Sequence, residues 1–178
     1  MSACETEFDS LLFGVRRSIR YHNRRRLFFD RIHTISTVLS AIGGSATIIA
    51  VVKEAGNLWI VIFAAAVAVF SAVDLVVGTA QAARRHHDFA KRYFDIEKKM
   101  ISSGSPADAD VVGFKSQRLD IEAEESPPLK ILDSLCHNEL CRALGYDVSA
   151  YAQIKWYQRI LCQLFDIHEH KLKMQGCK

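Results

Sequence analysis

The sequence predicts an all-α protein: a two-span transmembrane helical hairpin with long cytoplasmic helical extensions and a C-terminal cytoplasmic helical region. Residues 33–52 and 58–77 are twenty residues each and contain one formally charged side chain, Asp74. A helix of that length covers roughly 30 Å, the thickness of a bilayer's hydrocarbon core. Arginines and lysines gather just outside both segments. No stretch has the period-two alternation of a half-buried strand.

The distribution of cationic residues predicts the orientation of the hairpin. Basic residues precede the first span and follow the second, whereas the short connection has only Lys53, balanced by Glu54. Cytoplasmic flanks carry the excess of lysine and arginine in membrane proteins. Both termini are therefore expected in the cytoplasm, with lipid headgroups as partners of the basic residues. The residues assigned to this headgroup and topology role are Arg24, Arg25, Arg26, Arg84 and Arg85.

Helical periodicity without breakers predicts two long helices that extend from the spans into the cytoplasm, one from about residue 7 to 53 and one from the second span to about Met100. The expected segments are a cytoplasmic N-terminal helix over 1–32, transmembrane helices over 33–53 and 58–80, an outward loop over 54–57, a helical extension over 81–101, and a cytoplasmic three-helix region over 106–178. In that last region, Ser105-Pro106 and Ser126-Pro127-Pro128 are helix-start signals, and Gly145 is a stop signal. A final helix is expected from about Ser149, and its expected apolar face consists of Ile154, Tyr157, Ile160, Leu161, Leu164 and Phe165.

The N-terminus and the cysteines indicate in which cellular compartment the chain resides. MSACETEFDS is acidic and lacks the basic start of a secretory signal, so no cleavage is expected. Five cysteines lie in predicted cytoplasmic segments, where an odd number of thiols in a reducing compartment indicates free cysteines.

Small residues recur four apart within both spans. Such stripes let helix backbones approach closely where lipid offers no hydrophobic drive for association. They are interpreted as helix-packing positions, within the hairpin or against neighbouring protomers: Ser36, Ser40, Gly44, Ala64, Ala68 and Ala72.

The second span also carries a polar face with Ser71, Asp74 and Gln81. An intramembrane carboxylate is expensive and is therefore a functional hypothesis by default. These three residues are candidates for lining or gating a pore. The alternative for Asp74 is a local pair, because an antiparallel hairpin places it near the depth of Arg31 and His33.

Other chemistries find weaker support in the sequence. Arg17-x4-His22 has the form of a short ribonuclease motif, but arginine is abundant here. CHNELC (136–141) and the HEH triplet (168–170) lack the four clustered ligands of a structural zinc site. The basic belt has no stacking-aromatic context for nucleic acid. We therefore expect no enzyme activity, no metal, no cofactor and no nucleic-acid partner.

Three segments carry a resemblance to a known family: RYHNRRRLFFDRIHTISTVLSAIGGSA (20–46), FSAVDLVVGTAQAARRHHDFAKRY (70–93) and EESPPLKILDSLCHNELCRALG (124–145). With the two-span layout, they resemble the SLATT superfamily of bacterial and prophage conflict-system membrane proteins.

The resemblance implies a homo-oligomeric, multi-pass protein of the bacterial inner membrane. Its expected role is a pore that disrupts membrane integrity in phage defence or mobile-element conflict, under a cytoplasmic sensor or signalling partner. The alternative is a non-conducting membrane scaffold or phage exclusion factor that recruits a cytoplasmic partner through residues 106–178.

Overall fold

The computed structural model describes residues 3–52, 58–104 and 107–167. These residues form an all-α protein with no β-strand in the described ranges. They divide into two compact units. Unit 1 comprises residues 1–24 and 87–178, and unit 2 comprises residues 25–86. Helix α1 (Ala3–Val52) and helix α3 (Thr79–Ser102) contribute residues to both.

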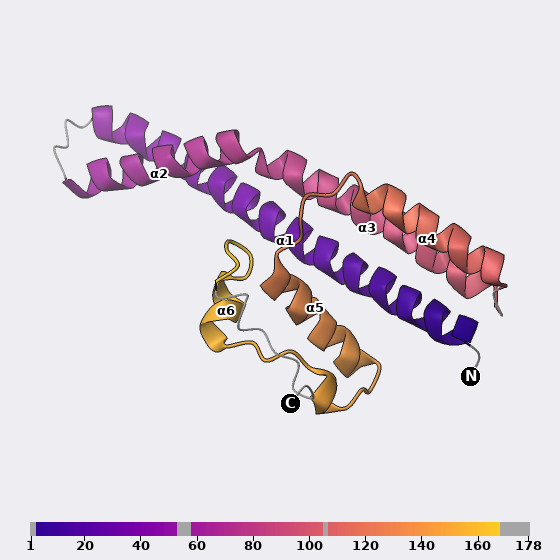
Figure 1. Ribbon diagram of the computed structural model, residues 1–178. Helices are drawn as coiled ribbons and strands as arrows, with labels where there is room; N and C mark the ends of the chain where they lie inside the picture. The colour runs from indigo at the N-terminus through magenta and orange to yellow at the C-terminus, as the bar shows by residue number, and fades with distance from the viewer. Residues whose placement is uncertain (1–2, 53–57, 105–106, 168–178) are drawn as a thin grey trace. The chain divides into compact units, whose positions relative to one another are not determined.

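The larger core of unit 1 joins three helices. The N-terminal part of α1, the C-terminal part of α3 and α4 (Asp108–Glu122) bury their apolar stripes against one another. Val15, Tyr93 and Met100 are completely buried there. Within unit 1, Figure 1 shows this part of α1 between the α3–α4 pair on one side and α5 on the other.

A second core of unit 1 packs α5 (Lys130–Ala143) against α1 and the segment that follows α5. Tyr21 of α1 lies with Ile131, Leu132 and Cys136 of α5, and Cys162 closes the cluster. After α5, Gly145 adopts φ +73°, a left-handed conformation that glycine accepts at a helix end. A short 3-10 helix (Val148–Ala150) and α6 (Trp156–Leu161) follow.

Unit 2 is a pair of helices formed by α1 from Arg25 onward and by α2 (Leu58–Val77), which continues into the first turns of α3. Phe29 of α1 stacks on His86 with centroids 5.7 Å apart, and it packs with Ala82 and Ala83. At Gly43, an added Cβ would lie 2.8 Å from Val67, so the two helices approach closely where the side chain is absent.

Two expected helices differ in the structure. The second span does not continue unbroken to Met100, because Gly78 adopts φ +62° and separates α2 from α3. Up to Ile167, where the description ends, the last expected helix from about Ser149 is reduced to the six residues of α6. The expected outward loop 54–57, Ser105-Pro106 and the HEH triplet lie outside the described residues.

The all-α class is confirmed, but the structure does not support the predicted two-span membrane hairpin. Among the described residues, no single helix meets a criterion of length and hydropathy for crossing a bilayer. One bent pair, Val61–Val77 with Thr79–Ser102, meets it by length and composition.

Candidate functional sites

Several polar side chains of unit 2 lie between its two helices, whereas Thr34 and Thr37 are exposed and donate to carbonyls one turn back in α1. The Ser40 and Ser71 hydroxyls lie 2.7 Å apart, and Ser36 donates to the Phe70 carbonyl at 3.4 Å. Asp74 lies beside His33, with 3.2 Å between Oδ2 and Nδ1, and it also accepts a hydrogen bond from the Thr79 hydroxyl. Asp74 thus has the local pairing that the sequence offered as the alternative to a pore-lining role.

The outer surface of the same helices is apolar. Large side chains of α1 and α2 point away from the helix pair, and several are more than half exposed: Ile35, Ile42, Leu58, Trp59, Val61, Val69, Leu75 and Val76. A soluble protein buries such residues and exposes its hydroxyls. Unit 2 therefore has hydroxyls at the contact between its helices and large apolar side chains on its outer surface.

The remaining predicted helix-packing and pore-lining residues of unit 2 take different positions. Ala64 is half-buried, Ala68 and Ala72 are exposed, and Gln81 is exposed near the start of α3. Gly44 lies in α1, but its packing is outside the described residues. The close approach of the two helices instead uses the neighbouring Gly43, which the four-residue spacing did not select.

The five predicted headgroup arginines also differ in their surroundings. Arg24 forms an ion pair with Glu139 in unit 1. In unit 2, Arg25 lies over the Phe29 ring at 4.6 Å, and Arg26 lies 3.5 Å from Asp30 one turn later. Arg84 and Arg85 are exposed on α3.

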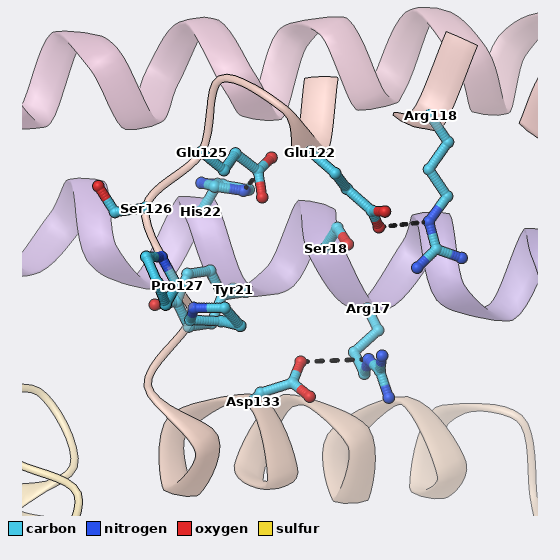
Figure 2. Close-up of a pocket in the computed structure, with 11 residues that line it drawn as sticks. Arg17, Ser18, Tyr21, His22, Arg118, Glu122, Glu125, Ser126, Pro127 and Asp133 are labelled. Carbon is cyan, nitrogen blue, oxygen red and sulfur yellow. Dashed lines mark hydrogen bonds and ion pairs between the residues drawn. The ribbon is translucent and has the colours of Figure 1, made fainter. Parts of the chain in front are cut away.

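Unit 1 contains a pocket of about 470 Å³ that the sequence did not predict. Figure 2 shows its lining, which comes from α1, α4, α5 and the loop between α4 and α5. The lining residues are Arg17, Ser18, Tyr21, His22, Arg118, Glu122, Glu125, Ser126, Pro127, Pro128 and Asp133. The volume is in the range of small-molecule sites.

Three pairs of charged or ionisable side chains line this pocket (Figure 2). Arg17 Nε lies 3.1 Å from Asp133, Arg118 Nε lies 2.7 Å from Glu122, and His22 Nε2 lies 3.0 Å from Glu125. Burial raises the pKa of Asp133, and the positive charge of Arg17 opposes that rise. Three carboxylates outnumber the two guanidinium groups, so the pocket has no excess positive charge for an oligonucleotide backbone.

Arg17 and His22, the pair considered as a ribonuclease motif, both line this pocket. However, the His22 side chain is only 3% exposed and is paired with Glu125. It is also stacked on Tyr93, with ring centroids 5.6 Å apart. Since a general base must reach the proton that it removes, this arrangement favours a structural role for His22.

The cysteine and histidine residues of CHNELC do not gather around a metal position. Cys136 and Cys141 are buried free thiols, and His137 Nε2 lies 3.0 Å from the Ala150 carbonyl oxygen. In the described part of the chain, no three metal-ligating side chains cluster. Burial raises the pKa of the Cys136 thiol to about 12.

Comparison with known proteins gives no relative. No protein-family model matches the chain, and neither the curated proteins nor the solved structures contain a significant match.

Proposed function

We propose that this chain is a homo-oligomeric protein of the bacterial inner membrane whose unit 2 inserts as a two-helix hairpin and forms a pore. The observation that carries the proposal is the polarity of unit 2, with hydroxyls and Asp74 between the helices and large apolar residues outside. Lipid is the solvent that such a surface matches. The resemblance to SLATT proteins adds the context of phage defence or mobile-element conflict, under an unidentified sensor or signalling partner.

In this proposal, oligomerisation brings several hairpins around one axis, with Ser71, Asp74 and Gln81 as the candidate lining. When the pore opens, water would replace the contact between Ser40 and Ser71 and the contacts of Asp74. The pore would act through loss of membrane integrity and not through covalent chemistry. The basic residues at the ends of the hairpin would contact lipid phosphates.

Controlled expression in bacterial cells tests the proposal. A membrane-potential dye should report depolarisation by the native chain, and fractionation should recover the protein from alkaline-washed membranes. Asp74→Ala and Ser40→Leu should change the depolarisation, because both alter the polar interior of the hairpin. Leu75→Ile is the matched control, since Leu75 is 83% exposed on the outer surface.

The pore is excluded if the native chain inserts and oligomerises while the membrane potential and the ion permeability of reconstituted vesicles stay unchanged. The pairing of Ser71 and Asp74 within the hairpin favours a second function, a non-conducting scaffold, because neither residue needs water as a partner. For a scaffold, replacing the hairpin by two unrelated spans should preserve function. For a pore, the same replacement should abolish it.

A further inference from the structure

Helix α6 of unit 1 buries a glutamine and exposes two of its large apolar residues. Gln158 and Cys162, one turn apart, are the buried residues on the inner face, with exposed fractions of 3% and 2%. Trp156 and Ile160, also one turn apart, face outward with exposed fractions of 74% and 68%. A helix that served only a soluble core would turn its tryptophan and isoleucine inward.

The exposed apolar face extends beyond α6. Leu164 and Phe165 follow in a turn that is closed by hydrogen bonds from their N–H groups to the Leu161 carbonyl, and both are more than half exposed. We define the α6 face as Trp156, Ile160, Leu164 and Phe165. Exposure of several large apolar side chains along one short segment is typical of a surface that meets another molecule or a membrane.

Two hydrogen-bond arrangements hold the α6 face outward. The Gln158 side chain accepts from the Lys155 N–H at 3.0 Å and donates to the Ile167 carbonyl at 2.9 Å, so the buried amide is satisfied. The Asp166 carboxylate accepts from the N–H groups of Lys130 and Ile131 at 2.7 and 3.0 Å. Asp166 therefore anchors the segment after α6 to the start of α5, and the apolar residues of the α6 face remain exposed.

The charges beside the α6 face are cationic. Lys155 and Arg159 are exposed, Lys155 Nζ lies 5.9 Å from the centre of the Tyr157 ring, and neither cation forms an ion pair with a carboxylate among the described residues. The neighbouring Asp166 is engaged with the start of α5. Tryptophan and phenylalanine beside lysine and arginine are the composition of segments that lie in the interface of an anionic bilayer.

We propose that the α6 face of unit 1 docks onto the surface of an anionic lipid bilayer. Trp156, Ile160, Leu164 and Phe165 enter the headgroup boundary, and Lys155 and Arg159 contact lipid phosphates. A second copy of the chain fits less well, because a self-complementary contact would bring the same cations of two copies together. The inference relies on the proposed function only in that the inserted hairpin holds the full chain at the bilayer.

The chain's two tryptophans allow this docking to be tested separately from hairpin insertion. Trp59 lies in the hairpin and Trp156 in the α6 face. The full chain as Trp59→Phe is reconstituted into vesicles of phosphatidylcholine with phosphatidylglycerol, and lipids brominated near the headgroup should quench Trp156. Quenching should be weaker in pure phosphatidylcholine. The Trp156→Phe chain should show Trp59 quenched in both lipids.

Substitutions give the expected size of the effect. Lys155→Gln and Arg159→Gln should each lower the ratio of docked to undocked Trp156 about fivefold, because a cation near an anionic surface contributes about 1 kcal/mol. Lys98→Gln, which removes an exposed lysine elsewhere in unit 1, should leave the ratio unchanged. Ile160→Ser should weaken docking, whereas Val112→Ser, at a residue 66% exposed on α4, should not.

Each outcome has one meaning. Quenching of Trp59 without quenching of Trp156 overturns the docking proposal and leaves the proposed function standing. Quenching of Trp156 without that of Trp59 supports docking and contradicts hairpin insertion, and absence of both contradicts both. If Trp156 is shielded from iodide but is not quenched by brominated lipid, it is covered by protein, and the docking proposal is overturned. Shielding that depends on protein concentration would identify that protein as a second copy of the chain.

Discussion

The contact between His22 and Glu125 offers a test of what joins α1 to the loop after α4. The two side chains are 3% and 16% exposed, and the pair is separated by 103 residues in sequence. His22→Phe keeps a ring in the stack on Tyr93 but removes the hydrogen bond. Because the Glu125 carboxylate then loses this partner in a largely buried place, the expected cost is about 1–3 kcal/mol of unfolding free energy.

His22→Ala should cost more than His22→Phe. It removes the hydrogen bond together with the ring, which packs against Tyr21, Phe89 and Tyr93. Truncating a buried aromatic side chain typically costs about 3–5 kcal/mol, because a cavity remains. The order of stability should therefore be native chain, then His22→Phe, then His22→Ala.

Urea unfolding of the full chain in detergent micelles, followed by far-UV circular dichroism, measures this order. Glu124→Gln is the control, because Glu124 neighbours Glu125 but is exposed in its pair with Arg92, and such surface pairs often contribute nothing measurable. If His22→Phe unfolds like the native chain, the hydrogen bond to Glu125 does not stabilise this junction. The bond from the Leu129 N–H to the Tyr21 hydroxyl, 3.0 Å long, would then be its main polar connection.

Three further predictions concern unit 1. Burial raises the pKa of Asp133 in the folded chain. The contribution of the protonated carboxyl to folding stability is therefore complete below the unfolded pKa and is lost as pH rises through the folded pKa. Arg17→Gln removes the opposing positive charge and should raise the folded pKa further, as NMR titration of the carboxyl would show. With a pKa of about 12, the Cys136 thiol should resist iodoacetamide at neutral pH in the native chain and react after unfolding in urea. Ile131→Ala, at a completely buried position of α5, should lower the unfolding free energy by about 2–5 kcal/mol in the same urea assay.

The helices of this fold could be predicted because their signals are local. Apolar periodicity and the absence of breakers predicted one helix from about residue 7 to 53, and α1 covers Ala3–Val52. Pro127-Pro128 and Gly145 bracket α5 as expected. Gly78 was missed because an isolated glycine in an apolar run is usually tolerated in a helix, and only its backbone angle shows the break.

The pocket of unit 1 could not be predicted in the same way. Two of its three pairs join residues far apart in sequence, Arg17 with Asp133 and His22 with Glu125. Nothing in the spacing of arginines along α1 indicates which of them will meet a carboxylate of α4, α5 or the loop between them. The sequence did identify Arg17 and His22 as a pair of interest, but for a catalytic motif and not for this arrangement of charges.

A sequence pattern can show that apolar residues share one face of a helix without showing whether that face is buried or exposed in the fold. Periodicity indicated that Ile160 and Leu164 share an apolar face, and in the structure both side chains are exposed. The polar residues explain why: Gln158 satisfies both ends of its amide inside the fold, just as Ser40 and Ser71 satisfy each other inside unit 2. Once the inner polar groups have protein partners, water is not needed on that side, and the apolar residues remain outside. Facing water, such a surface would be an aggregation liability. Facing lipid, it is the stable arrangement, and this common inversion favours a bilayer as the partner of both surfaces.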